Sequence, residues 1–95
     1  MHYVYLIQSR YHPDQHYIGL TGDLRRRLQQ HKSATSPHTK KFRPWDLIAY
    51  FAFQSEATAA SFEKYLKSGS GRAFVRRHFH PLPFAPLERR LERPP

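Results

Sequence analysis

The sequence contains no cysteine, few acidic residues and no long apolar run. Without cysteine the chain can form no disulfide bond, no thiolate metal site and no cysteine nucleophile. No segment approaches the roughly 20 apolar residues that a membrane-spanning helix needs. The first residues lack the charged-then-apolar layout of a signal peptide, so we expect a cytoplasmic protein without membrane contact. P-loop, H-E-x-x-H and serine-triad patterns are also missing, which argues against those classes of enzyme.

The shortage of acid leaves the chain strongly positive. Sixteen Lys and Arg residues face seven Asp and Glu residues, for a formal net charge of +9. Such an imbalance favours a polyanionic partner, although a basic surface kept for solubility is the alternative. The residues expected to contact nucleic acid form two clusters, Arg25, Arg26, Lys32, Lys40, Lys41 and Arg43 in the first half and Lys67 and Arg72 in the second.

A chain of 95 residues is long enough for one modest core and too short for two. We expect residues 1–80 to form one domain and residues 81–95 to form an appended tail rich in proline. The tail could contact a partner protein, but its composition and terminal position favour a disordered end.

Residue patterns predict a small sheet with helices packed on it, an α/β class of fold. Residues 3–7 and 16–19 are rich in β-branched and aromatic residues on either side of a Pro-Asp turn, which is typical of an antiparallel hairpin. Strict alternation over residues 45–53 predicts a third strand. Capping residues and apolar spacing predict helices over 23–32, from Ser55 to about residue 67, and over 72–79, with a glycine break at 68–71 and a loop at 33–44.

Arg27 and His31 lie four residues apart in the first predicted helix and therefore share one face. That face borders the apolar stripe of Leu24 and Leu28. A guanidinium held at the edge of a buried stripe suits bidentate binding of a phosphate. The alternative is that Arg27 only covers the core with its aliphatic part and that His31 is structural.

Glu63 borders the apolar stripe of Ala59, Phe62 and Leu66 in the second predicted helix. Carboxylates are rarely buried unless they are paired or bound to metal. One carboxylate, together with substrate phosphate oxygens and water, is a normal way to hold Mg²⁺. A surface ion pair with Lys67, four residues on, explains the position equally well.

Tyrosines supply a third group of candidates. Tyr3 and Tyr5 share one face of the first strand, and Tyr17 lies on the neighbouring strand. A phenol with its ordinary pKa of about 10 is protonated at neutral pH, but a nearby arginine or metal stabilises the phenolate and creates a base. Plain packing is the alternative.

In combination these residues resemble the GIY-YIG endonuclease family. Tyr3-Val4-Tyr5 and Tyr17-Ile18-Gly19 are similar to the two motifs that name the family. The segments 20–28 and 60–64 resemble its arginine helix and its metal-glutamate helix. The similarity extends from about Tyr3 to Phe79 and is greatest to small stand-alone members that resemble the N-terminal nuclease domain of the excision-repair nuclease. One departure is Tyr3, which stands where the first motif has glycine and could alter substrate access.

The resemblance implies a three-stranded antiparallel sheet flanked by helices in the order β-β-α-β-α-α. It implies a metal-dependent endonuclease that hydrolyses phosphodiester bonds in DNA, directed by structure rather than sequence, which a protein partner could deliver to its substrate. In that family Glu63 would hold one divalent ion, Mg²⁺ or Mn²⁺, Arg27 would stabilise the phosphate, Tyr5 or Tyr17 would help to activate water, and His31 would support them. The alternatives are a non-catalytic nucleic-acid-binding module with the same fold and an interaction domain for an acidic protein.

Overall fold

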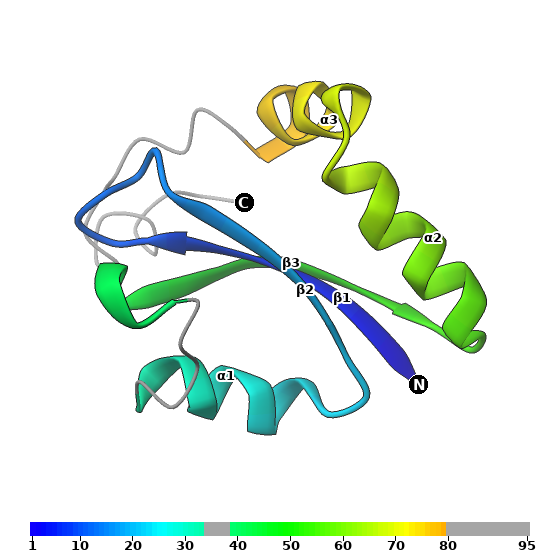
Figure 1. The fold of residues 1–95 in the computed structure, drawn as a ribbon, viewed down its shortest axis with the longest axis horizontal. Helices are drawn as coiled ribbons and strands as arrows, with labels where there is room; N and C mark the ends of the chain where they lie inside the picture. The colour runs from blue at the N-terminus through cyan, green and yellow to red at the C-terminus, as the bar shows by residue number, and fades with distance from the viewer. Residues whose placement is uncertain (34–38, 80–95) are drawn as a thin grey trace, which may run out of the picture.

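The computed structural model describes residues 1–33 and 39–79, which form three strands and three α-helices (Figure 1). The proline-rich segment 81–95 lies outside the described residues, so its predicted role as a tail stays a prediction. The predicted order of elements is confirmed, and the fold is α+β. In chain order the elements are β1 (His2–Ser9), β2 (His16–Thr21), α1 (Leu24–Lys32), the short 3₁₀ helix η1 (Lys40–Phe42), β3 (Trp45–Phe53), α2 (Glu56–Leu66) and α3 (Gly69–Phe79).

The sheet has the order β2-β1-β3, with β1 antiparallel to both neighbours. Helix α1 lies on one side of this sheet, and α2 and α3 lie on the other (Figure 1). The central strand is therefore covered on both faces, and Val4 to Ile7 are at most 2% exposed. This burial explains why β1 is a continuous apolar and aromatic run instead of an alternating one.

Strand β3 contains an irregularity that the predicted alternation misses. Leu6 pairs with Ala49 and Ile7 with Leu47, so Ile48 is an extra residue between two paired positions. A bulge of this kind reverses the faces of the residues on one side of it. Ile48 consequently packs against the core, whereas Leu47 is 40% exposed. The third strand is confirmed, but the strict alternation predicted over residues 45–53 is interrupted at Ile48.

The main core lies between the sheet and the helices α2 and α3. It is built from the buried residues Val4, Leu6, Ala59, Leu66 and Val75. The predicted stripe on α2 is confirmed, since Ala59 and Leu66 are buried and Phe62 packs beside them. The predicted capping is confirmed as well, because the Ser55 side chain accepts a hydrogen bond from the Thr58 amide.

Helix α3 begins three residues earlier than predicted, at Gly69 instead of Arg72. The Ser68 hydroxyl accepts a hydrogen bond from the Gly71 amide, which caps the new helix directly after α2. Gly71 is buried, and a Cβ there would collide with the Tyr65 carbonyl and the Leu66 backbone. The glycine therefore permits close packing of two helices and does not break one.

Helix α1 does not bury its predicted apolar stripe of Leu24 and Leu28, but another residue. Asp23 caps it as expected, accepting a hydrogen bond from the Arg26 amide. However, Leu24 and Leu28 are only partly buried and line an open groove beside Tyr3. His31 is the buried residue of α1, at 2% exposure. None of the helices in residues 1–33 and 39–79 has the length and apolar character to cross a membrane.

Candidate active site

The site is built around Tyr5, which lies at the centre of β1 and is fully buried. Its hydroxyl is 2.8 Å from His31 Nε2 and accepts a hydrogen bond of 3.3 Å from Arg27 Nε. Both partners come from α1, which covers this face of the sheet. The predicted sharing of one helix face by Arg27 and His31 is thus confirmed, and both residues contact one phenol.

Gly19 explains how the Tyr5 ring reaches α1. It pairs with Tyr5 across the two strands, and an added Cβ would collide with the Tyr5 hydroxyl and ring. Its backbone dihedrals are not of the left-handed kind that only glycine adopts easily. Gly19 is required because the phenol passes directly over its Cα, which is a physical reason for the glycine in Tyr17-Ile18-Gly19.

Thr39 is a site residue that sequence reasoning missed. It is fully buried, and its hydroxyl lies 2.6 Å from His31 Nδ1. Its carbonyl accepts a hydrogen bond of 2.7 Å from Trp45 Nε1 at the start of β3. Thr39 belongs to a polar segment with no pattern, so no sequence signal marked it. It fixes the orientation of the His31 ring from the side opposite to Tyr5.

Burial controls the protonation states of this cluster. It lowers the pKa of His31 below its ordinary 6.5, and the nearby Arg27 cation lowers it further, so His31 is neutral at pH 7. Burial also raises the pKa of Tyr5, only partly offset by the hydrogen bond from Arg27, so the phenol keeps its proton. With the His31 proton on Nδ1, Tyr5 donates to Nε2 while His31 donates to Thr39 at the same time.

Arg27 connects this buried cluster to solvent. Its side chain is partly buried, and a second nitrogen donates a 3.1 Å hydrogen bond to Gln30 Oε1. The hydrogen bond to Tyr5, with smaller contributions from Tyr17, raises the pKa of Arg27, so the guanidinium stays charged. A charged, planar and doubly held guanidinium suits binding of a phosphate.

Tyr17 lies beside the cluster on the edge strand β2. Its ring centroid is 6.2 Å from that of Tyr5 and 5.4 Å from that of His31. Unlike Tyr5 it is only partly buried. Tyr5 and Tyr17 are therefore brought together. Tyr3 instead contacts Tyr50, with 6.1 Å between the two ring centroids.

Glu63 lies on α2. Its carboxylate is 24% exposed and forms a 3.2 Å ion pair with Lys67. Its charge makes a minor contribution to the raised pKa of Tyr5, after burial and the neighbouring Tyr17. The predicted surface ion pair is confirmed, and the role of Glu63 as a metal ligand stays a prediction.

A divalent ion fits this donor set. No group of three His, Cys, Asp or Glu residues gathers in the described ranges, so these residues form no closed cage, and Glu63 is the carboxylate that would contribute. That number suits Mg²⁺, which usually keeps several waters and binds one or two carboxylates together with phosphate oxygens.

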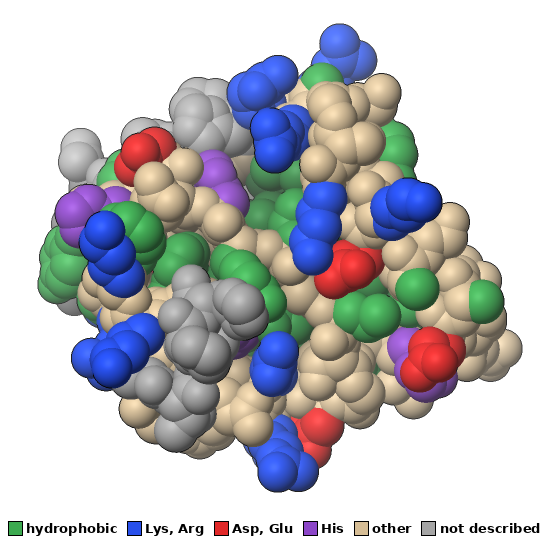
Figure 2. All heavy atoms as spheres, viewed as in Figure 1, with side chains coloured by type: hydrophobic (Ala, Val, Ile, Leu, Met, Phe, Trp, Pro, Cys, Tyr) green, Lys and Arg blue, Asp and Glu red, His purple; other side chains and the backbone are tan. Residues whose placement is uncertain are grey.

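The residues predicted to contact nucleic acid are all exposed but do not form one patch. Arg25 borders the groove near Leu24 on the α1 side of the sheet. Lys67 and Arg72 line another groove, beside β2. Arg26, Lys32, Lys40, Lys41 and Arg43 are exposed along α1 and η1. On the face of the molecule that Figure 2 shows, Lys and Arg side chains are spread around a hollow with a hydrophobic floor.

Together the fold and the site define a small α+β domain that holds a charged arginine against a buried tyrosine and histidine, an arrangement suited to binding a phosphodiester. The family model of the GIY-YIG catalytic domain matches residues 1–77. The chain belongs to the GIY-YIG family.

Two relatives carry the name structure-specific endonuclease subunit SLX1. The protein from Scheffersomyces stipitis is 43% identical over 67 residues, and that from Debaryomyces hansenii is 41% identical over 71 residues. These matches cover 63% and 67% of this chain but only 20% of each relative, so the chain spans about a fifth of their length. Among solved structures, the UPF0213 protein BH0048 from Bacillus halodurans is similar, with a TM-score of 0.51 and 30% identity over 84% of this chain and 87% of that chain.

Proposed function

We propose that the protein is an endonuclease that hydrolyses phosphodiester bonds in DNA with the help of a divalent metal ion. The convergence of Arg27, Tyr5 and His31 in one hydrogen-bonded cluster, with Tyr17 packed against His31, is the observation that carries this proposal. Membership of the GIY-YIG family and the endonuclease names of two relatives support it.

Arg27 is proposed to bind the scissile phosphate and to stabilise the negative charge that develops on it. A donor of this kind is worth about 10²–10³ in rate when it is aimed at the transition-state charge. Tyr5 has its hydroxyl occupied by two hydrogen bonds and no exposure to solvent. We therefore assign Tyr5 as a positioning residue that orients Arg27 together with His31.

Tyr17 is proposed as the group next to the attacking water, because it is the motif tyrosine with solvent exposure and it packs against His31. As the water oxygen bonds to phosphorus, the bond from phosphorus to the leaving oxygen breaks and its electron pair leaves with that oxygen. The Tyr17 oxygen, acting as a phenolate next to Arg27 and the ion, would take the proton of the water and become a phenol. Glu63 would hold the divalent ion, Mg²⁺ or Mn²⁺. When bound, the ion supplies positive charge to the phosphoryl oxygens.

Recognition of DNA structure rather than sequence is proposed, since phosphate contacts carry no sequence information and two relatives are named structure-specific endonucleases. The same relatives are named subunits, which supports a protein partner for this domain.

A cleavage panel tests the proposal. Supercoiled plasmid, single-stranded DNA and branched DNA are incubated with the protein and Mg²⁺ or Mn²⁺, and then with EDTA. Glu63→Ala is compared with Glu56→Ala, which removes an exposed carboxylate from the first turn of the same helix. We expect metal-dependent cutting by the wild type and Glu56→Ala, and none by Glu63→Ala.

Cutting that persists in Glu63→Ala would show that Glu63 is no metal ligand or that a contaminant cuts the DNA. Tight DNA binding by the wild type without cleavage of any substrate would replace the proposal with the non-catalytic binding module.

A further inference from the structure

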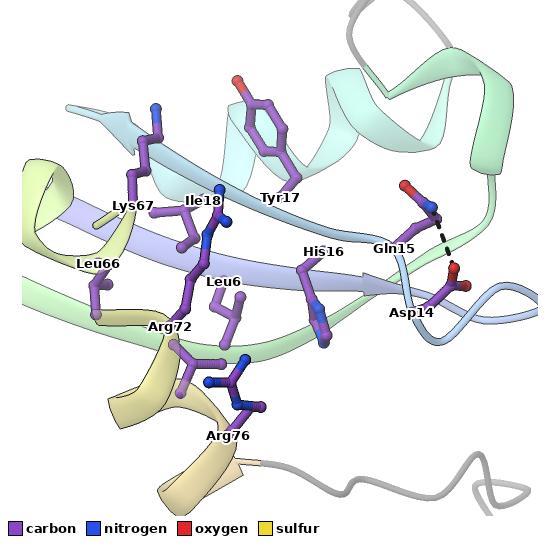
Figure 3. A pocket seen from close by; sticks show the side chains of 11 residues that line it. Leu6, Asp14, Gln15, His16, Tyr17, Ile18, Leu66, Lys67, Arg72 and Arg76 are labelled. Carbon is purple, nitrogen blue, oxygen red and sulfur yellow. Dashed lines mark hydrogen bonds between the residues drawn. The ribbon is translucent and has the colours of Figure 1, made fainter. Parts of the chain in front are cut away.

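A groove with a volume of about 580 Å³ lies between the edge strand β2 and helix α3. We call it the β2–α3 groove. Figure 3 shows Arg72 extending from α3 toward β2, with Arg76 one turn further along the helix. The apolar part of its lining comes from the core residues Leu6, Ile18, Leu66 and Val75, and the basic part comes from Lys67, Arg72, Arg76 and His16.

The basic side chains of the groove are placed to bind an anion. Arg72 and Arg76 are exposed and lie four residues apart, so they share one face of α3. No acidic residue in the described part of the chain forms an ion pair with either of them. Asp14, the one acidic lining residue, contacts the Gln15 amide at 3.4 Å. Arg76 is not among the residues that the sequence predicts to contact nucleic acid.

Two residues connect the groove to the candidate active site. Tyr17 borders the groove on β2, but its side chain points away from Arg72 and Arg76 (Figure 3) and packs against His31, with 5.4 Å between ring centroids. Lys67 lines the groove and pairs with Glu63 at 3.2 Å. A nucleic-acid strand whose phosphate lies at Arg27 and Glu63 would therefore pass over the edge strand β2 to reach the groove.

We infer that the β2–α3 groove binds one unstacked nucleotide of a single-stranded segment next to the scissile phosphate, with the base on the apolar floor and the phosphates on Arg72 and Arg76. The inference rests on the proposed function for the position of the scissile phosphate. A base inside an intact duplex would first have to leave its stack at a cost in free energy, whereas an unpaired base does not. The groove thus selects flaps and other substrates with an unpaired nucleotide beside the cut.

Binding of a short oligonucleotide in EDTA tests the groove without cleavage. The probe is a fluorescent pentathymidylate, measured by anisotropy over a range of salt concentrations. Arg72→Ala and Arg76→Ala should each weaken binding roughly fivefold, and each should reduce the salt slope by about 0.7. Arg77→Ala is the matched control, since Arg77 is exposed on the same helix but does not line the groove.

An abasic oligonucleotide of the same length tests the apolar floor separately. It keeps every phosphate but leaves the floor without a base, so the wild type should bind it roughly fivefold more weakly than the pentathymidylate. Arg76→Lys should keep most of the binding that Arg76→Ala loses. Thermal unfolding of each variant confirms that these exposed substitutions leave the fold intact.

Equal binding by Arg72→Ala, Arg76→Ala and Arg77→Ala would overturn the inference, as would equal affinity for the abasic probe. If those results came with normal cleavage of a flapped DNA, the proposed function would stand without the groove. If binding depended on the base and on both arginines but no DNA was ever cut, the nucleotide site would stand and the endonuclease proposal would fail.

Discussion

Replacement of Gly19 by alanine is the substitution whose effect on the candidate site the structure allows us to work out in most detail. The new Cβ would collide with the hydroxyl and ring of Tyr5. Tyr5 is fully buried, so its ring cannot turn into solvent, and it can move only by breaking hydrogen bonds to His31 and Arg27. Overpacking costs about 1–3 kcal/mol and each lost hydrogen bond about 1 kcal/mol, so the free energy of unfolding should fall by roughly 2–5 kcal/mol.

Thermal unfolding measures this effect. For a domain of this size, a loss of that magnitude lowers the Tm on the order of 10–30 °C. Gly22→Ala is the matched control, because a Cβ there meets nothing within 4 Å, and its effect should stay within about 0.5 kcal/mol. In a Tyr5→Ala background the cost of Gly19→Ala should fall below about 1 kcal/mol, because the colliding ring is gone. A Gly19→Ala protein as stable as Gly22→Ala would refute the close approach of Tyr5 to β2.

Three further predictions concern buried contacts. Thr39→Val leaves His31 Nδ1 without its buried partner, so it should lower the free energy of unfolding by about 1–3 kcal/mol. In urea titrations the control Thr58→Val, at an exposed position, should change the free energy of unfolding by no more than roughly 0.5 kcal/mol. Equal effects of the two substitutions would contradict the role of Thr39. The lowered pKa of His31 means that the unfolded state binds its proton more readily, so stability present above pH 6.5 should be lost as the pH falls, more steeply than in His31→Gln. Parallel stability curves for the two proteins would exclude that origin. Gly71→Ala should cost about 1–3 kcal/mol where Gly69→Ala costs little, and equal Tm values would argue against the close packing of α2 and α3.

The elements of the fold could be predicted from the sequence because their signals are local. Asp23 and Ser55 cap their helices as expected, and the hairpin strands follow from β-branched and aromatic runs. The errors arise where a distant contact decides the outcome. The bulge at Ile48 depends on pairing with β1, and the helix start at Gly69 depends on packing between α2 and α3.

The candidate site was predictable where helix spacing places two residues on one face, as for Arg27 and His31. It was not predictable where burial or a long-range hydrogen bond assigns the role. Sequence spacing marked Leu24 and Leu28 as the buried stripe of α1, yet the hydrogen bonds to Tyr5 and Thr39 draw His31 into the interior instead. Thr39 has no local pattern at all, and only the folded chain places it against His31.

The rate of DNA cleavage by Arg27→Ala tests the central claim most directly. Single-turnover rates are measured on the branched DNA that the wild type cuts best, beside Arg77→Ala, which removes an exposed arginine outside the cluster and outside the residues expected to contact DNA. The account predicts a fall of about 10²–10³-fold for Arg27→Ala at saturating protein, with little change for Arg77→Ala. Equal rates for the two variants, with both proteins folded, would contradict the assignment of Arg27 to the scissile phosphate.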